Sequence, residues 1–370
     1  MSTQTASQSA ATSGQTAALA ERQAGTEFYR TAWDGLNVAT VGLGTYLGNP
    51  DDATDARYAR AIRRYLELGG NLIDSAINYR FQRSERVIGA ALRAAIAAGI
   101  VSRDQVVLCT KGGYLSFDGE WPAEPEAWIR ETFLDTGIVQ SDEVVDGHCM
   151  APAYLRHEIA QSRLNLQVEC IDLYYLHNPE AQLPAIGPTV FRERLREAFA
   201  TFEVAVAQGQ LRAYGVATWN GLRAAPGAPD YLSLHTLLET AQDVSGDRHH
   251  FRAVQLPLNL RMLEAAGGRN QPGTAGLASL LQVAAESNIA VMASASLLQG
   301  KVIGRLPEGL RAKIGAGLTD AQCGLQFARS TPGISAGLAG MSQIEHVEEN
   351  LALRSVPPLS VRAWRSVFQP

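Results

Sequence analysis

The sequence has few cysteines and no cluster of basic residues. Its four cysteines stand at positions 109, 149, 170 and 323 of a 370-residue chain, without a CxxC pair. A chain of this length does not depend on disulfides, so we interpret them as free thiols in a reducing compartment. The net charge is −5, and Lys and Arg are scattered singly or in pairs. This distribution argues against a nucleic-acid partner.

Long apolar runs are also missing. No segment approaches the roughly 18 residues that a membrane-spanning helix needs. The N-terminus lacks the charged region followed by an apolar region that marks a secretory signal. We therefore expect a cytoplasmic protein without a membrane partner. Residues 1–25 are rich in Ser, Thr, Gln and Ala, a composition that predicts a disordered tail.

Residues 26–370 predict a single domain of the α/β class, a (β/α)8 TIM barrel. The apolar content of 46% is enough for a large core. Weak alternation over residues 28–41 predicts an N-terminal hairpin, and Ser84 stands where it would cap a helix that ends near Gly99. Short apolar runs, each followed by a helical pattern as in a parallel barrel, lie near residues 41, 72, 107, 172, 213, 254, 290 and 336.

One connection, the insertion at 112–150 after the third predicted strand, is much longer than the others. Because it follows the C-terminal end of a strand, it would lie over the ligand-binding face as a lid or as a wall of the substrate pocket. Alternatively, its aromatic residues only dock it onto the barrel. The pair His148-Cys149 near its end has no further ligands at metal spacing, so we expect no metal site.

Three successive predicted strands end in ionisable residues. The stretch NLIDSAINYRFQRSE carries Asp74 and Tyr79, VVLCTKGG carries Lys111, and CIDLYYLHNP carries His177. In a parallel α/β protein, these strand ends lie on the face where ligands bind. Residues 42–48, GLGTYLG, do not make a dinucleotide-binding GxGxxG motif, because the third glycine is replaced by leucine.

This combination suits the reduction of a carbonyl group. A phenol near pKa 10 is a poor acid at neutral pH. A lysine about 4 Å away would favour the phenolate of Tyr79 by roughly 4 kcal/mol at an effective dielectric near 20, so we expect a lowered pKa. Asp74 would keep Lys111 charged and oriented, and His177 would hydrogen-bond the carbonyl oxygen.

These four residues, with the phrases IDSAxxY, TKGG and IDLYYLH, resemble the catalytic tetrad of the aldo/keto reductase family. The resemblance covers about residues 38–352 and continues through GVATWN, VQLPLN, SASLLQG and GMSQIEHVEEN. The long insertion resembles the sugar or aldose dehydrogenase branches of the family more than the steroid-reducing ones. The family implies a (β/α)8 oxidoreductase that uses NADP, with NAD as the alternative, on a small-molecule carbonyl or alcohol.

The resemblance also implies a cofactor site that departs from the family pattern. His346 stands where the family often has Arg or Gln, and a cationic residue there commonly holds the 2′-phosphate of the cofactor. Ala217-Thr218 replaces the Ser-Asn pair that usually holds the nicotinamide carboxamide. Ser294 replaces the Tyr that stacks on the nicotinamide ring, and Trp219 is the candidate to form the wall beside that ring instead. The expected cofactor-binding residues are Gly44, Thr45, Asp74, Thr218, Gln255, Ser294, Leu297, Gln299, Gly300, Gly340, Ser342, His346, Glu349 and Asn350.

Two other functions account for parts of the sequence. A barrel that keeps the cofactor as a ligand could serve as a non-catalytic binding or regulatory subunit; the intact tetrad argues against this and the altered carboxamide contacts argue for it. The chain could also be a sugar-binding or lyase barrel without nicotinamide. In that case the resemblance of residues 340–350 to the cofactor-binding segment of the family would be a coincidence. The motifs do not encode the oligomeric state.

Overall fold

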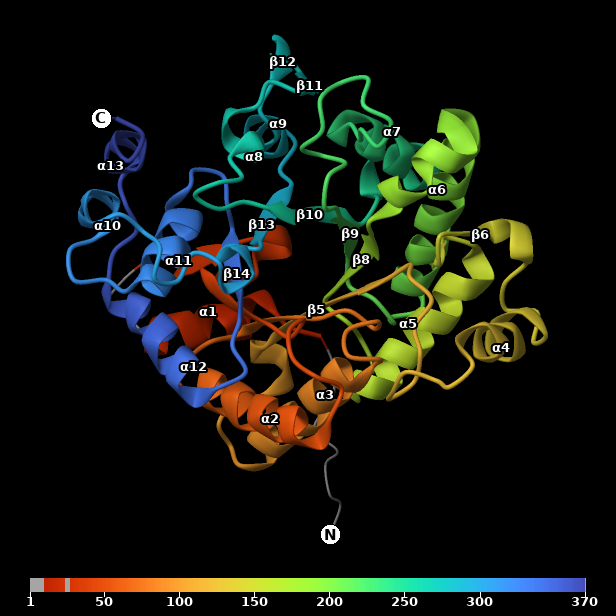
Figure 1. The fold of residues 1–370 in the computed structure, drawn as a ribbon, viewed down its shortest axis with the longest axis horizontal. Helices are drawn as coiled ribbons and strands as arrows, with labels where there is room; N and C mark the ends of the chain where they lie inside the picture. The colour runs from red at the N-terminus through yellow and green to blue at the C-terminus, as the bar shows by residue number, and fades with distance from the viewer. Residues whose placement is uncertain (1–9, 24–26, 370) are drawn as a thin grey trace.

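The computed structural model describes residues 10–23 and 27–369, and its centre is a closed barrel of eight parallel strands (Figure 1). Around the barrel the order is β10-β13-β14-β3-β4-β5-β8-β9. The strands are β3 (Val41–Gly44), β4 (Leu72–Asp74), β5 (Val107–Gly112), β8 (Leu173–His177), β9 (Tyr214–Ala217), β10 (Phe251–Pro257), β13 (Ala290–Ser294) and β14 (Ala336–Gly340). The predicted (β/α)8 fold is confirmed, with a strand at each expected position.

Helices surround the barrel and bury one face against it (Figure 1). In α2, buried Tyr58, Ala61, Ile62 and Tyr65 recur at helical spacing, and the Tyr65 hydroxyl donates to the Val41 carbonyl at 2.8 Å. Among the described helices, none has the length and apolar composition that a membrane crossing needs. The main helices are α2 (Asp52–Glu67), α3 (Arg83–Ala97), α5 (Pro152–Leu166), α6 (Leu183–Ala207), α7 (Leu234–Ser245), α9 (Leu280–Glu286), α11 (Asp320–Ser330) and α12 (Ile344–Leu351). Shorter ones are α8 (Glu264–Gly267), α10 (Glu308–Ile314) and α13 (Val361–Ser366).

The start of α3 differs from the expectation. Its N-cap is Gln82, in the left-handed conformation with φ of 69°, and Ser84 lies inside the helix. The Ser84 hydroxyl donates instead to the Thr45 carbonyl at 2.8 Å, and so ties α3 to the loop after β3. The expected cap is therefore wrong, because a tertiary contact takes the hydroxyl.

The N-terminal region contains both the expected hairpin and an unexpected helix. Strands β1 (Tyr29–Thr31) and β2 (Asn37–Ala39) pair antiparallel. Before them, α1 (Ser13–Arg22) begins at a Thr12 side-chain cap. The expected disordered tail is wrong for residues 10–23; residues 1–9 and 24–26 lie outside the described part of the chain.

Contacts with the barrel explain the order of α1. The Ala11 amide donates to buried Asp172 at 2.6 Å, and the Thr12 amide donates to the Asp104 carbonyl at 2.9 Å. Ala11, Thr16 and Leu19 are buried. Small residues and backbone hydrogen bonds anchor this segment, and composition alone does not reveal either contribution.

The insertion 112–150 forms a small substructure beside α5 (Figure 1). It contains α4 (Pro125–Ile129) and a hairpin of β6 (Val144–Val145) and β7 (His148–Cys149). The Cys149 amide donates to the Gly113 carbonyl at 2.7 Å, which holds the end of the insertion against its beginning. Phe133, Val139 and Cys149 of the insertion form a separate buried cluster with Ala151 and Tyr154 at the start of α5, and Trp128 packs against this cluster.

Candidate active site

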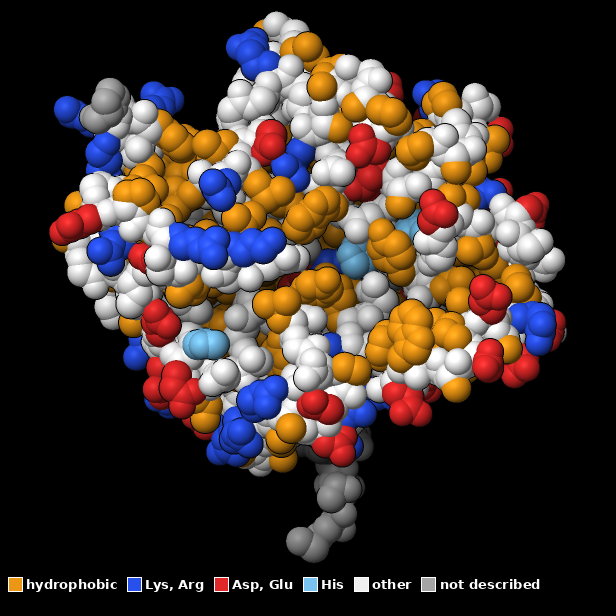
Figure 2. Space-filling view, viewed as in Figure 1, with side chains coloured by type: hydrophobic (Ala, Val, Ile, Leu, Met, Phe, Trp, Pro, Cys, Tyr) orange, Lys and Arg blue, Asp and Glu red, His pale blue; other side chains and the backbone are white. Residues whose placement is uncertain are grey.

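A cavity of about 720 Å³ opens among the C-terminal ends of the barrel strands. The face in Figure 2 is hollowed near its middle, and hydrophobic side chains gather around the hollow. Four large apolar residues that are exposed to solvent line this cavity: Tyr46, Leu47, Trp219 and Ile303. Apolar surface that is left open in a concave site is typical of ligand binding.

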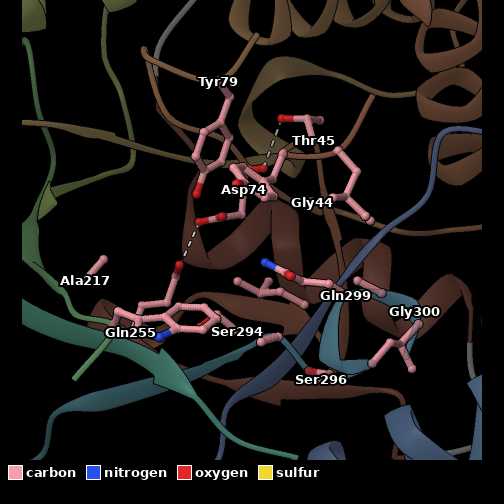
Figure 3. A pocket seen from close by; sticks show the side chains of 18 of the residues that line it. Gly44, Thr45, Asp74, Tyr79, Ala217, Gln255, Ser294, Ser296, Gln299 and Gly300 are labelled. Carbon is pink, nitrogen blue, oxygen red and sulfur yellow. Dashed lines mark hydrogen bonds between the residues drawn. The ribbon is translucent and has the colours of Figure 1, made fainter. Parts of the chain in front are cut away.

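A buried ion pair lies at the floor of the cavity. Lys111 Nζ is 2.6 Å from Asp74 Oδ2, and the two side chains are 1% and 7% exposed. Lys111 also donates to the Ser75 carbonyl at 2.7 Å, and Gln255 Nε2 donates to the other Asp74 oxygen at 2.8 Å (Figure 3). Burial acts to lower the pKa of Lys111, but Asp74 and Tyr79 outweigh it and raise the pKa above its ordinary value. Lys111 is therefore charged at neutral pH.

Tyr79 projects over this ion pair. Lys111 Nζ lies 4.9 Å from the centre of the Tyr79 ring. Figure 3 shows the phenol oxygen pointing toward Asp74. Burial raises the pKa of Tyr79 above its ordinary value, and Lys111 opposes this shift without reversing it. The expected lowering of the pKa is therefore wrong: removal from water penalises the phenolate more than Lys111 stabilises it.

His177 lies at the end of β8, with its ring centre 5.9 Å from that of Tyr79. Burial, Lys111 and His148 all hold the pKa of His177 well below its ordinary value, so the ring is neutral at pH 7. Its Nδ1 is buried without a hydrogen-bond partner among the described residues. The His177 ring therefore has a nitrogen that, within the described chain, is free to hydrogen-bond a ligand in the cavity.

His148, from the insertion, supports the backbone of His177. Its Nε2 lies 2.7 Å from the His177 carbonyl oxygen, and its Nδ1 lies 3.1 Å from Gln182 Nε2. Because Gln182 donates to Nδ1, we assign the His148 proton to Nε2. Burial lowers the pKa of His148 to about 4, so this arrangement persists at neutral pH.

The structure places nearly all expected cofactor residues around one cavity. Of the expected cofactor residues, Ser342 does not line the cavity. The catalytic residue Lys111 does not line it either, because its side chain is buried beneath the cavity surface. The expected residues that line the cavity are Gly44, Thr45, Asp74, Thr218, Gln255, Ser294, Leu297, Gln299, Gly300, Gly340, His346, Glu349 and Asn350.

Two unpaired polar atoms mark the regions where an elongated ligand would be held. Thr218 Oγ1, after β9, and Asn350 Oδ1, in α12, are buried and have no partner within the described chain. Buried polar atoms normally find partners, so both favour a polar ligand in the cavity. The residues therefore fit a nicotinamide dinucleotide. Gln255 was expected to contact the cofactor, but its side-chain amide nitrogen already donates a hydrogen bond to Asp74.

The sequence analysis missed several residues that line the cavity. Tyr46, Asn78, Tyr114 and Asn178 all face it. Asn78 precedes Tyr79, and Asn178 follows His177 and donates to the Tyr114 hydroxyl at 3.2 Å. For Asn78 and Asn178, the position next to a tetrad residue was the signal available in the sequence, whereas Tyr46 and Tyr114 have no such neighbour.

Comparison with known proteins decides the family. The sequence model described as "Aldo/keto reductase family" matches residues 40–234, which is more than half of the chain. The chain belongs to the aldo/keto reductase family. The matched region includes all four residues that resemble the family tetrad.

Curated members of the aldo/keto reductase family are distant relatives. Aldo-keto reductase YhdN of Bacillus subtilis is 26% identical over 200 residues, which cover 52% of this chain and 47% of that protein. NADH-specific methylglyoxal reductase of Escherichia coli is 28% identical over 187 residues, or 49% of each chain. The chain thus spans about half the length of these relatives.

Solved aldo/keto reductase structures share the fold. An aldo/keto reductase from Klebsiella pneumoniae, in complex with NADP and acetate, has a TM-score of 0.61 and 22% identity, over 92% of this chain and 94% of that one. A Bacillus halodurans aldo-keto reductase in its holo form has a TM-score of 0.61 and 20% identity, with the same coverage.

Proposed function

We propose that this aldo/keto reductase transfers a hydride between NADP(H), or NAD(H) as the alternative, and a small-molecule carbonyl compound or the corresponding alcohol. One observation carries the proposal: Lys111, paired with Asp74, lies 4.9 Å from the ring centre of Tyr79 at the floor of the cavity. The dinucleotide, when bound, supplies or accepts the hydride. The protein must then supply and accept the proton.

Tyr79 performs the proton transfer. In the direction of reduction, its hydroxyl gives a proton to the oxygen of the former carbonyl, and the resulting phenolate is stabilised by the ammonium of Lys111. His177 hydrogen-bonds the same substrate oxygen. In the direction of oxidation, the phenolate takes the proton of the alcohol. Because the pKa of Tyr79 is raised, the phenol is protonated at neutral pH and has a proton to give, whereas its release depends on the stabilisation of the phenolate by Lys111. Alkaline conditions, which favour the phenolate, should favour oxidation.

The unpaired atoms suggest how the dinucleotide lies. Thr218 would hold the carboxamide end, together with the remaining hydrogen-bonding capacity of Gln255. Asn350 and Glu349 would hold the adenosine end, with His346 near the 2′-phosphate. The four cysteines are all free, which supports a reducing compartment, and we propose a cytoplasmic location on this basis.

The test of the proposed function separates binding from chemistry. Tyr79→Phe removes one hydroxyl, so cofactor binding should stay within about tenfold while turnover of an aldehyde falls by about 10² or more. Tyr46→Phe is the matched control, because its ring lies 5.0 Å from that of Tyr79 in the same cavity, whereas the ring over which Lys111 lies is that of Tyr79. It should retain turnover within about tenfold. Undiminished turnover in Tyr79→Phe would remove Tyr79 from the mechanism, and cofactor binding without any turnover in the native protein would favour a binding subunit.

A further inference from the structure

Trp219 stands out on the wall of the cavity that follows β9. It is 43% exposed, although it is the bulkiest side chain on this wall. Its neighbours among the lining residues at the ends of β9, β10 and β13 are small or polar: Ala217, Thr218, Gln255 and Ser294. An open indole ring among such residues offers a flat apolar surface to a ligand.

The backbone that carries this ring is held on both sides. One oxygen of Glu180 accepts hydrogen bonds from three consecutive amides, those of Trp219 at 2.9 Å and of Asn220 and Gly221 at 3.1 Å. On the other side, the Trp219 carbonyl accepts a hydrogen bond from Arg223 Nη1 at 2.9 Å. These hydrogen bonds hold the backbone of the turn in place, while the Trp219 side chain remains exposed to the cavity.

Glu180 is built into the fold beneath this turn. It is 4% exposed, and its burial raises its pKa, whereas the three amides act in the opposite direction. Gly221 allows the close approach, because a Cβ atom there would lie 2.8 Å from Leu232 and 3.2 Å from the Glu180 Cβ. A buried carboxyl group that serves three amides of one turn indicates a site whose geometry is held in advance of binding.

We propose that Trp219 is the aromatic platform against which the nicotinamide ring packs, and that Glu180 is the positioning residue that fixes this platform. The inference rests on the proposed function. The cofactor is favoured over the carbonyl substrate as the occupant, because Trp219 directly follows Thr218 and shares its wall with Gln255, the two residues proposed to hold the carboxamide. Ser294, on the same wall, offers no ring of its own.

Cofactor titration tests the platform without recourse to activity. NADPH is titrated into the full chain and followed both by calorimetry and by quenching of tryptophan fluorescence. Trp219→Phe keeps a ring and should stay within about threefold of the native Kd, whereas Trp219→Ala should weaken binding about three- to tenfold, the range expected for one aromatic pair. Both variants should lose most of the quenching. Trp121→Phe is the control, because Trp121 is 64% exposed but is not a lining residue of the described cavity; it should change neither readout.

The role of Glu180 is tested by two substitutions of similar size. Glu180→Gln keeps an oxygen that can accept from the amides and should bind NADPH within about threefold of the native protein. Glu180→Leu removes the acceptor and should weaken binding about as much as Trp219→Ala. The double variant Glu180→Leu/Trp219→Ala should be no weaker than either single variant, a non-additivity that general destabilisation would not produce. Thermal melting identifies any variant that fails to fold, and the result for exposed Trp219 then decides the inference.

Three results would overturn the inference. A native Kd in Trp219→Ala would show that the ring does not touch the cofactor. A raised KM for the carbonyl compound with an unchanged cofactor Kd would assign the ring to the substrate. A native protein that binds neither NADPH nor NADH would overturn the proposed function as well, and this outcome is distinct from the first two.

Discussion

Replacing Lys111 by Met should affect stability and chemistry together. The substitution leaves Asp74 buried, with Gln255 still donating to it but with no cation beside it. Breaking a buried ion pair by removing one partner typically lowers the free energy of unfolding by about 3 to 5 kcal/mol. Because the phenolate of Tyr79 also loses its stabilising charge, turnover should fall by about 10² or more.

Two further variants separate these effects. In Asp74→Asn/Lys111→Met, neither side chain is charged, so urea denaturation should show a smaller loss of stability than in Lys111→Met alone. Turnover should remain low, because the cation is still missing. Lys313→Met, at an exposed position, should change stability by less than about 0.5 kcal/mol.

The pH dependence of the stability difference follows from the raised pKa of Lys111. A lysine whose pKa is higher in the folded state contributes its full stabilisation below the unfolded pKa, about 10.4, and loses it as the pH rises through the folded pKa. The difference between the native protein and Lys111→Met should therefore be constant from about pH 6 to pH 9 and shrink only in stronger alkali. If Lys111→Met were as stable as the native protein across this range, or if the double variant were the less stable of the two, the account of the ion pair would be refuted.

Three further predictions concern the cofactor end, the insertion and the N-terminal helix. His346→Arg should tighten NADPH binding by about tenfold and leave NADH within about twofold, because guanidinium stays charged and pairs with the 2′-phosphate; equal effects on both cofactors in calorimetry would place His346 away from that phosphate. Tyr114→Ala should raise the KM for aldehydes several-fold without changing the cofactor Kd, since Tyr114 lines the cavity from the insertion, whereas a change in cofactor affinity alone would reassign it. Deleting residues 1–22 should lower the free energy of unfolding by about 2 to 4 kcal/mol, from the burial of Leu19 and the lost contact with Asp172, and an unchanged denaturation midpoint would show that α1 does not contribute to stability.

Local patterns predicted the barrel because they repeat with its architecture. Each barrel strand appeared as a short apolar run before a helical pattern, and parallel strands must end on one face. Asp74, Tyr79, Lys111 and His177 could therefore be assigned to one site before any contact was known. The insertion was visible as an overlong connection, but its separate cluster around Phe133 was not.

Contacts between distant segments were not visible in the same way. The expected disorder of residues 10–23 failed because Ala11 meets Asp172, 161 positions away. The predicted cap at Ser84 failed because its hydroxyl bonds to Thr45, 39 positions away. Neither partner can be inferred from the composition of a local window.

The sequence by itself determined which ionisable groups meet, because strand order and the alternation of strands and helices place them at the same end of one barrel. Only the tertiary structure decided their protonation. The charge of Lys111, considered alone, predicted a lowered pKa for Tyr79. The folded chain removes the phenol from water, and this burial raises the pKa of Tyr79 instead. The direction of that shift depends on the sum of burial and charge over all neighbouring elements, and this sum exists only once the chain has folded.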